Sequence, residues 1–407
     1  MANTFRVTDM VAKESLRIAH ESLGFINTVD RQYDEDFKPS GRSGLHGSTM
    51  RVKDPNQYTV RTGNAMAVQE QAESTQTITV ATLKGIDMGF TMQELIQSVD
   101  NDGAFDDLSS KYIQPAISSL CSVIESDFIA FCSKATYNLV GSAGTALTTL
   151  DVPGKARAKL NQNIAPKGKG NRFIQTDSLT MGGMVTGVSG LFHDGAQIKE
   201  QYREGMMGRT AMADWYENDR MWTMPNSADV IGAINAGTLT SGITSLTVDG
   251  LTAAPVEGMV FTVAGVNAVH PETKASFGSL QQFVAGAGCT TTNLVFTPAI
   301  IFATTNPKQN VSGAPVTTAA ITFVGSASTN YMQSLMYHKE AYQFIAAPLP
   351  IVDEAQKCVR VMKDGLSLRA WMGPDIRNNE LLMRIDILYG FAALRPQWAT
   401  RMIGAVS

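Results

Sequence analysis

One segment of the chain, residues 228–325, differs in composition from the residues on either side, and this contrast most limits the possible folds. Thr, Val, Ala and Gly dominate the segment, and basic residues nearly vanish from it. Short runs rich in β-branched residues, such as 245–248 and 259–263, are separated by turn residues, a pattern typical of a small antiparallel barrel. We therefore expect an autonomous β-barrel inserted into a host of another class.

The host segments mix helical and strand patterns, which predicts an α+β fold. The strongest helical signal covers residues 105–137, where Pro115 indicates either a kink or a later start. Strands are expected at 172–175, 366–371 and 381–394. The apolar stripe of the long helix has helical spacing and consists of Leu108, Tyr112, Ile113, Ala116, Ile117, Leu120, Ile124, Phe128 and Phe131.

The residues before this helix predict an extended region. Residues 8–24 have the spacing of an amphipathic helix. Two alternating runs, 49–53 and 57–61, flank the turn Asp54-Pro55-Asn56, which predicts a projecting hairpin, and a further strand is expected at 76–82. We assign contacts with a neighbouring subunit to five residues of the hairpin: Arg51, Lys53, Asp54, Asn56 and Arg61.

Composition excludes several classes of protein. Charged residues make up 17% of the chain, against about 25% in an average globular protein, so much of the surface is neutral and suits contact between copies. The net charge of -4 argues against a protein that grips phosphate backbones. The four cysteines are far apart, without a CxxC, which indicates reduced, buried thiols. Residues 1–30 lack a signal-peptide pattern, and no long apolar run predicts a membrane span.

No catalytic, cofactor or metal motif is found in the sequence. The five histidines are scattered, and His193-Asp194 lacks a GxSxG partner. The glycine-rich stretch 182–190 has neither GxGxxG nor P-loop spacing, so we interpret it as a flexible turn. Residues 196–203 are helix-prone. We predict a protein that is not an enzyme and has no cofactor.

Two charge clusters stand out. The basic residues Lys155, Arg157, Lys159, Lys167, Lys169 and Arg172 surround a polar loop. They could touch nucleic acid or an acidic partner, but no aromatic residue is interleaved for base stacking, and a solvated loop is the favoured interpretation. The acidic residues Asp100, Asp102, Asp106 and Asp107 precede the long helix, where negative charge stabilises the helix dipole.

The order of these parts resembles the coat proteins of short-tailed phages of enteric bacteria, whose fold is shared by tailed-phage and herpesvirus shells. The likeness runs along essentially the whole chain. Its departures are a shorter insertion and an Ala/Thr-rich stretch at 310–320 without a place in the family pattern. The stretches that carry it are 263–267, 270–274 and 280–284 in the insertion, 337–341 and 348–350 at the re-entry into the host, and 389–396, which resembles the family's closing strand.

This resemblance implies a division of the chain and a set of partners. The expected parts are an N-terminal arm (1–30), a projecting loop (31–80), a peripheral domain with a spine helix (81–140), an axial domain (141–227), the inserted barrel (228–325) and return strands (326–407). The resemblance also implies hexamers and pentamers that close an icosahedral shell around double-stranded DNA, a scaffolding protein, a portal protein, and a procapsid that matures on DNA packaging. Assembly is expected in the bacterial host cytoplasm, without membrane contact.

Other readings of the sequence remain open. A tail or decoration protein of the virion would use the β insertion as its working module. An enzyme with a β-barrel binding domain would need a polar pocket that the sequence does not indicate. A secreted carbohydrate-binding protein would need a signal peptide.

Overall fold

The computed structural model describes residues 13–19, 23–31, 49–58, 60, 63–66, 68, 75–91, 112–188, 208–237, 239–351, 357–363 and 366–406. The chain divides into two compact units, each built from three segments. Unit 1 comprises Met1–Val52, Thr75–Phe128 and Tyr342–Ala392, and unit 2 comprises Lys53–Ser74, Ile129–Ala341 and Ala393–Ser407. Helices and mostly antiparallel strands occur together in the chain, so the predicted α+β class is confirmed.

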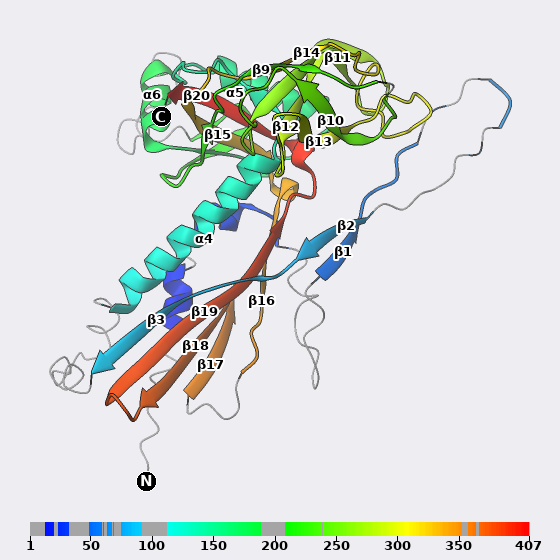
Figure 1. Cartoon of the computed structure of the whole chain (residues 1–407). Helices are drawn as coiled ribbons and strands as arrows, with labels where there is room; N and C mark the ends of the chain where they lie inside the picture. The colour runs from blue at the N-terminus through cyan, green and yellow to red at the C-terminus, as the bar shows by residue number, and fades with distance from the viewer. Residues whose placement is uncertain are drawn as a thin grey trace. The chain divides into compact units, whose positions relative to one another are not determined.

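Unit 1 contains a five-stranded antiparallel sheet built around β19 (Figure 1). The long strand β19 forms ladders with β3, β16 and β18, and β17 pairs with β18 at the edge. The predicted strands in 366–371 and 381–394 are confirmed. The strands are β3 (Thr82–Thr91), β16 (Gln343–Ala347), β17 (Lys357–Lys363), β18 (Leu366–Asp375) and β19 (Glu380–Ala392).

Helix α4 (Gln114–Ala135) confirms the predicted long helix within the described residues. The helix begins at Gln114, so Pro115 lies in its first turn, where the missing N–H of proline costs no hydrogen bond. This proline therefore marks a later start of the helix and not a kink. The predicted residues 105–111, and the acidic cluster expected to cap the helix, lie outside the described residues. Ile117, Leu120 and Ile124 are buried, whereas Tyr112, which we placed in the stripe, is 45% exposed.

The buried stripe of α4 packs against the sheet and the N-terminal segment. A cavity of about 10 Å³ is lined by residues of all three, including Ile117, Ala19 and Ile385. Residues 13–19 are helical, which confirms this part of the helix predicted at 8–24. The carboxylate of Glu125, wholly buried in α4, accepts a hydrogen bond from the backbone N–H of Phe25. The apolar stripe of α4 therefore holds two segments that are distant in sequence.

The ring of Phe128 is the centre of an aromatic cluster in unit 1. Its centroid lies 5.1 Å from that of Phe25, 5.6 Å from Phe344 and 5.7 Å from Phe391. The side chain is fully buried, and aromatic pairs at these separations add stabilisation beyond the area they bury. One side chain thus connects the helix, the N-terminal segment and two strands.

Replacing Phe128 with Ala should lower the free energy of unfolding by about 3–5 kcal/mol, because the cavity left between three rings cannot close easily. Val123→Ala on the exposed side of the same helix is the control and should change stability little. Chemical denaturation of both variants measures the difference, and equal midpoints would show that Phe128 is not a core residue.

Unit 2 contains a seven-stranded mixed sheet with two helices. Its apolar core joins α5 and α6 to the sheet through buried residues such as Leu160, Met184 and Met402. The strand predicted at 172–175 is confirmed as β5. The elements are β4 (Leu139–Val140), α5 (Asp151–Gln162), β5 (Arg172–Thr176), α6 (Ser178–Val188), β6 (Arg209–Thr210), β7 (Ala213–Glu217), β8 (Thr223–Pro225), β15 (Asn330–His338) and β20 (Ala399–Val406).

The closing strand of unit 2 lies further along the chain than the sequence indicated. We placed the closing strand at 389–396, but that stretch contains the end of β19 and the start of a short 3-10 helix. β20 follows and pairs with both β15 and β4. Sequence reasoning missed β20 because its residues are buried over six positions in succession, so they show no alternation.

The glycine-rich stretch at 182–188 is helical, so our interpretation of it as a flexible turn is wrong. It belongs to α6, and residues 189–190, like the helix-prone stretch 196–203 and His193-Asp194, lie outside the described residues. A Cβ atom at Gly187 would overlap the carbonyl oxygen of Thr148, and one at Gly183 would lie 3.3 Å from the carbonyl oxygen of Leu147. These glycines let the helix approach a neighbouring backbone closely.

Gly187→Ala should therefore destabilise the protein by about 1–3 kcal/mol or more, because the added methyl group must displace backbone. Gly182→Ala in the same helix is a matched control, since a Cβ there meets no atom of the described residues within 4 Å. That variant should gain about 0.5–1 kcal/mol from helix propensity. Thermal melting distinguishes the two, and two shifts of the same sign would contradict the close-packing explanation.

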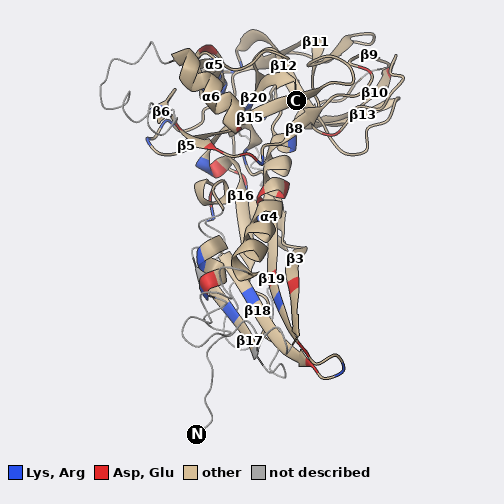
Figure 2. Cartoon of the chain, turned by 90° about the vertical axis from the view of Figure 1, so that its left-hand side faces the viewer, with Lys and Arg blue, Asp and Glu red and all other residues tan. Residues whose placement is uncertain are grey.

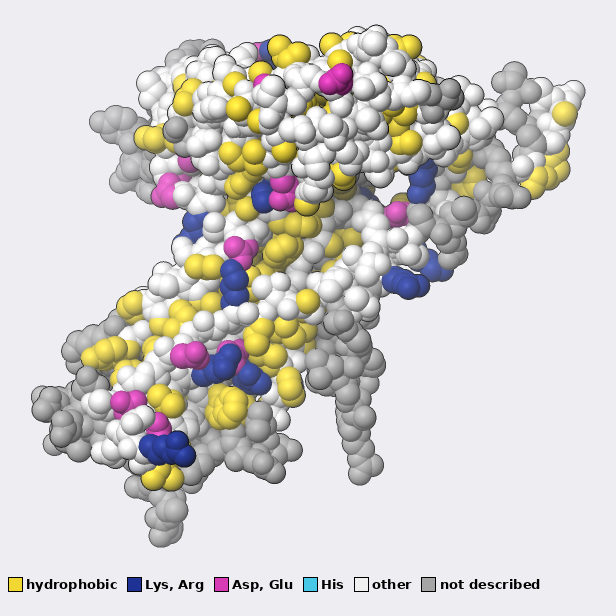
Figure 3. Space-filling view, viewed as in Figure 1, with side chains coloured by type: hydrophobic (Ala, Val, Ile, Leu, Met, Phe, Trp, Pro, Cys, Tyr) yellow, Lys and Arg dark blue, Asp and Glu magenta, His cyan; other side chains and the backbone are white. Residues whose placement is uncertain are grey.

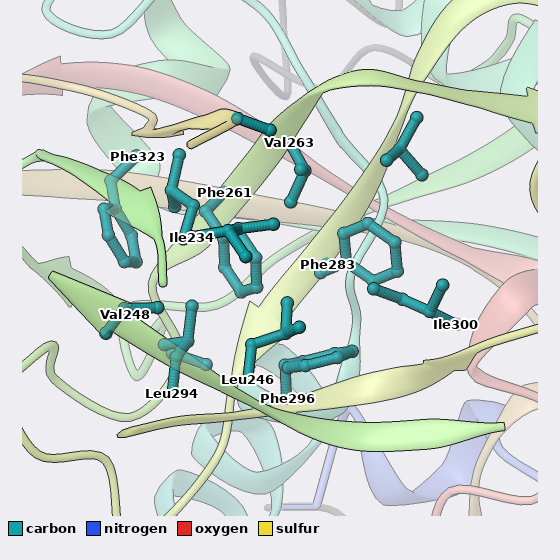
Figure 4. Packing of buried hydrophobic residues seen from close by; sticks show 14 of the residues in the cluster. Ile234, Leu246, Val248, Phe261, Val263, Phe283, Leu294, Phe296, Ile300 and Phe323 are labelled. Atoms are coloured by element: carbon teal, nitrogen blue, oxygen red, sulfur yellow. The ribbon is translucent and has the colours of Figure 1, made fainter. Parts of the chain in front are cut away.

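The predicted β-barrel is confirmed. Six strands close in the order β10-β13-β12-β11-β14-β9, all of them antiparallel. The interior holds stacked and edge-on phenylalanine rings, with Phe261 5.6 Å from Phe283 and 5.3 Å from Phe323 (Figure 4). The strands are β9 (Ile231–Ile234), β10 (Ile243–Asp249), β11 (Val260–Val269), β12 (Ser276–Ala285), β13 (Asn293–Ile300) and β14 (Ala320–Phe323).

The stretch 310–320, which the family pattern did not place, forms part of the barrel wall. Val311 is buried in the barrel core and bridges Ala268 of β11. The Asn310 side chain donates to the carbonyl of Ala299 at 2.7 Å and accepts from the N–H of Ile301 at 2.9 Å. These bonds tie the loop to the end of β13.

Candidate assembly surfaces

The hairpin predicted at 49–61 is wrong in its pairing. β1 (Thr49–Lys53) is a strand as expected, but its partner is β2 (Thr75–Thr79) and not residues 57–61. Among the described residues of 54–58, none is in a strand. The turn signal of Asp54-Pro55-Asn56 is therefore overridden by a partner further along the chain. We refer to residues 54–74, which link the two strands, as the β1–β2 connection.

The predicted contact residues lie in β1 and at the start of the β1–β2 connection. Arg51 and Lys53 are exposed and, two residues apart in a strand, lie on one face of it. Asn56 is exposed and Asp54 is half-buried. Arg61 lies outside the described residues. The structure thus places Arg51 and Lys53 side by side on one exposed face of β1.

Sequence reasoning missed the apolar side chains of the same connection. Tyr58 is 57% exposed, Val60 96%, Met66 83% and Val68 80%, and Figure 3 shows hydrophobic side chains on this segment (yellow, at the right of the view). Contact with another chain would remove this exposed apolar surface from water, which is favourable, so these side chains are candidates for an interaction. The sequence did contain a signal, because Tyr58 and Val60, and then Met66 and Val68, are apolar residues within an otherwise polar stretch.

One face of the unit 1 sheet carries a buried charge cluster. Asp386 is fully buried, and both of its oxygens are bonded to arginine: Arg369 at 2.6 Å and Arg384 at 2.7 Å. Figure 2 shows Lys and Arg positions on β18 and β19. The neighbouring β3 residue is Gly85, where a Cβ would overlap the Asp386 carboxylate. Because breaking such a pair leaves a buried charge uncompensated, the cluster fixes the cross-strand alignment of β18, β19 and β3.

The barrel is tied to the unit 2 sheet by a side chain that acts as a strand partner. The amide of Gln282 in β12 donates to the carbonyl of Leu139 at 2.8 Å and accepts from the N–H of Leu139 at 2.9 Å. Buried Arg401 of β20 donates to the carbonyl of Gly258 at 2.9 Å. Lys134 and Glu257 form an ion pair at 3.0 Å. These bonds, with a shared apolar cluster that includes Tyr331 and Val260, orient the barrel on its host.

The predicted basic cluster is not one surface. Lys155, Arg157 and Lys159 lie on α5, and Lys167 and Lys169 lie in the loop that follows. Arg172 is buried and donates to the carbonyls of Pro166 and Ala165 and to the side chain of Asn161. Its role is to hold this loop against β5, so it cannot contact a partner.

The prediction of buried thiols is confirmed for Cys121 and Cys132 and is wrong for Cys289 and Cys358, which are only partly buried. Neither Cys121 nor Cys132 forms a disulfide, and desolvation by burial raises the pKa of the Cys132 thiol well above its ordinary value. Burial lowers the pKa of His338, whose Nδ1 accepts from the N–H of Glu340. Among the described residues, no three His, Cys, Asp or Glu side chains are placed to hold a metal ion. α4 is long and apolar enough to cross a membrane, a property it shares with core helices.

Comparisons with known proteins agree with this architecture. Residues 229–404 match the family model described as P22 coat protein, gene protein 5. A solved structure of Mycobacterium phage Che8 is similar over 92% of this chain and 89% of that chain, with 11% identity and a TM-score of 0.51. The fold is that of tailed-phage capsids. Together with the family match, it supports a major capsid protein of a tailed phage.

Two further structures are similar to the chain. The mature capsid of bacteriophage PhiM1 shares 12% identity over 90% of this chain and 90% of that chain, with a TM-score of 0.41. The CUS-3 coat protein I-domain shares 26% identity over 24% of this chain and 97% of that chain, with a TM-score of 0.19. No curated protein sequence matches the chain.

The family match spans the six barrel strands and the strands that follow them as far as β20. It therefore includes Gln282 and Gly258, the barrel residues that bond to the host sheet, and Arg401 of β20. A match to a coat-protein family suggests a structural, non-enzymatic protein and a place in the virion capsid.

Gln282→Ala should weaken the attachment of the barrel to the unit 2 sheet, because the N–H and the carbonyl of Leu139 both lose a hydrogen-bond partner at a partly buried position. We expect a loss of about 1–3 kcal/mol and faster hydrogen exchange of the Leu139 amide. Gln281→Ala is the matched control, since within the described part of the chain that amide bonds only to the carbonyl of Gln282. Unchanged exchange at Leu139 in the Gln282 variant would mean that the apolar cluster alone positions the barrel.

Proposed function

We propose that the chain is the shell subunit of a tailed double-stranded DNA phage and assembles with copies of itself into hexamers and pentamers of an icosahedral capsid. The observation that carries the proposal is the capsid fold together with the coat-protein match over residues 229–404. The exposed apolar side chains of the β1–β2 connection support self-association, because contact with a second copy would remove their apolar surface from water.

The remaining partners follow from this function. Assembly runs through a scaffold-dependent procapsid in the cytoplasm of the bacterial host, with a portal protein at one vertex, and matures when DNA is packaged. The net charge of -4 supports a shell that encloses DNA without gripping it. Few charged residues, 17% of the chain, allow one surface to pack in the slightly different environments of hexamers and pentamers.

The intersubunit contacts are assigned to Arg51, Lys53, Asp54, Asn56 and Arg61, and we extend them to the apolar residues Tyr58, Val60, Met66 and Val68. Strand β1 gives the contact a fixed base, because it is paired with β2. The charged residues supply orientation and the apolar residues supply buried area, which is the usual division within an interface.

Reversing Arg51 and Lys53 to Glu should leave the subunit folded, because exposed charges contribute about 0–1 kcal/mol to its stability. Shell yield should fall, since the small loss at each contact is repeated at every subunit. Sedimentation of shells formed with the scaffolding protein measures the yield. Added salt should not restore it, because screening removes repulsion between charges but cannot recreate the lost attraction.

Two comparisons make this experiment decisive. Reversal of the exposed loop residues Lys167 and Lys169 to Glu changes the net charge equally and should assemble normally. Negative-stain micrographs of wild type with its scaffold should show closed shells. Equal shell yield for the Arg51/Lys53 variant would refute this contact alone, whereas failure of wild type to form any closed shell would refute the proposed function.

A further inference from the structure

A polar groove in unit 2 has no assigned role. It has a volume of about 630 Å³ and lies between the segment that follows β4, one face of α5, and Ser279 of barrel strand β12. Lys155 and Lys159, one helical turn apart, line it together with hydroxyl groups from Ser142, Thr145 and Thr149. Its volume falls within the range of ligand-binding pockets, about 300–1,000 Å³.

The charge of the groove is unbalanced. Its single lining carboxylate, Asp151, is already paired with Lys155 at 2.5 Å. Lys159 is half-buried, and among the described residues no carboxylate lies within ion-pair distance of it. Burial lowers the pKa of Lys159, which means that the ammonium group has lost water without a compensating anion. An anion in the groove would supply that compensation.

The other groups of the groove are suited to an oxyanion. Serine and threonine hydroxyls donate to carboxylate or phosphate oxygens, as does the amide of Gln162. Hydrogen bonds from an ammonium group to such oxygens are stronger than those between neutral groups. Apolar lining from Val140, Leu147 and Val152 offers contact for the aliphatic part of a side chain that carries the anion.

Three features favour a peptide over nucleic acid. The lining residues, all of them described, include no aromatic side chain on which a base could stack. A duplex presents one charge about every 1.7 Å along its axis and is held by a row of cations, but this groove has only one unpaired lysine. Arg172, which would lengthen the row, is buried in contacts within the chain.

We propose that this groove is a docking site for an acidic peptide segment of a partner protein, with a carboxylate of the peptide bound by Lys159 and the surrounding hydroxyls. Binding here does not depend on shell formation, because every lining residue belongs to unit 2 of a single chain. Arg157, Lys167 and Lys169 add positive charge on the same helix and the loop that follows, which speeds the approach of an acidic partner.

The test uses a fluorescein-labelled hexaglutamate peptide and the full chain before assembly, with anisotropy as the readout. Lys159→Gln should weaken binding about tenfold or more, as expected when a charge-assisted hydrogen bond is lost, and Lys159→Arg should retain most of it. Lys169→Gln, which removes an equal charge outside the groove, should change binding by less than about twofold.

A second variant guards against misfolding of the first. Ser279→Asp is at an exposed position, so the fold should be unaffected while the new carboxylate repels the peptide and weakens binding. Equal losses in the Lys159 and Lys169 variants would overturn the proposal in favour of non-specific attraction. Tighter binding of a labelled DNA duplex with the same dependence on Lys159, or full displacement of the peptide by inorganic phosphate at equal concentration, would also overturn it.

Discussion

The antiparallel pairing of β19 is the constraint on which unit 1 depends. This strand of 13 residues forms ladders with β3, β16 and β18. β3 comes from a distant part of the sequence, and β16 is separated from β19 by β17 and β18. Its inner side chains, such as Ile385 and Ile387, pack with α4. On the other face, Asp386 is held between two arginines and excludes any side chain at the neighbouring Gly85. A slip of one residue in β19 would turn Arg384 and Asp386 toward α4 and expose the aliphatic row of the same strand, so the alternation of side chains fixes the register.

The predictable parts of the fold are those in which the local pattern and the tertiary packing agree. The barrel was predictable because its strands are consecutive and alternate around turn residues. α4 was predictable because a stripe with helical spacing needs no knowledge of its partner. Failures occurred where a distant contact decides the outcome. β1 pairs with β2 across a long connection and not across the nearby turn. Gly187 lies in a helix despite its poor propensity, because the carbonyl of Thr148 leaves no room for a side chain.

The candidate surfaces were predictable only in part, for a related physical reason. Charge in a sequence does not say which cations reach solvent. Arg172 belongs to the basic cluster by its position in the sequence, but in the fold its guanidinium group is buried and donates hydrogen bonds to carbonyl groups of the preceding loop. Lys159, two turns from the start of α5, has no such partner among the described residues. The apolar residues of the β1–β2 connection could not be recognised as a candidate surface for the same reason. Their apolar character is visible in the sequence, but their exposure to solvent is known only from the fold.

The barrel gains its importance from its outer surface. Its interior is occupied by Phe261, Phe283 and Phe296, whose ring centroids lie within 6 Å of one another, and interiors packed in this way have no volume for a ligand. What the barrel offers its surroundings is therefore its wall and its loops. One part of the wall carries Gln282, whose amide completes the hydrogen bonding of β4 at the edge of the host sheet. Three residues earlier in the same strand, Ser279 borders the polar groove. Because a single strand of the barrel both fastens it to the host and closes one side of the groove, any shift of the barrel on the host sheet must also change the shape of that groove.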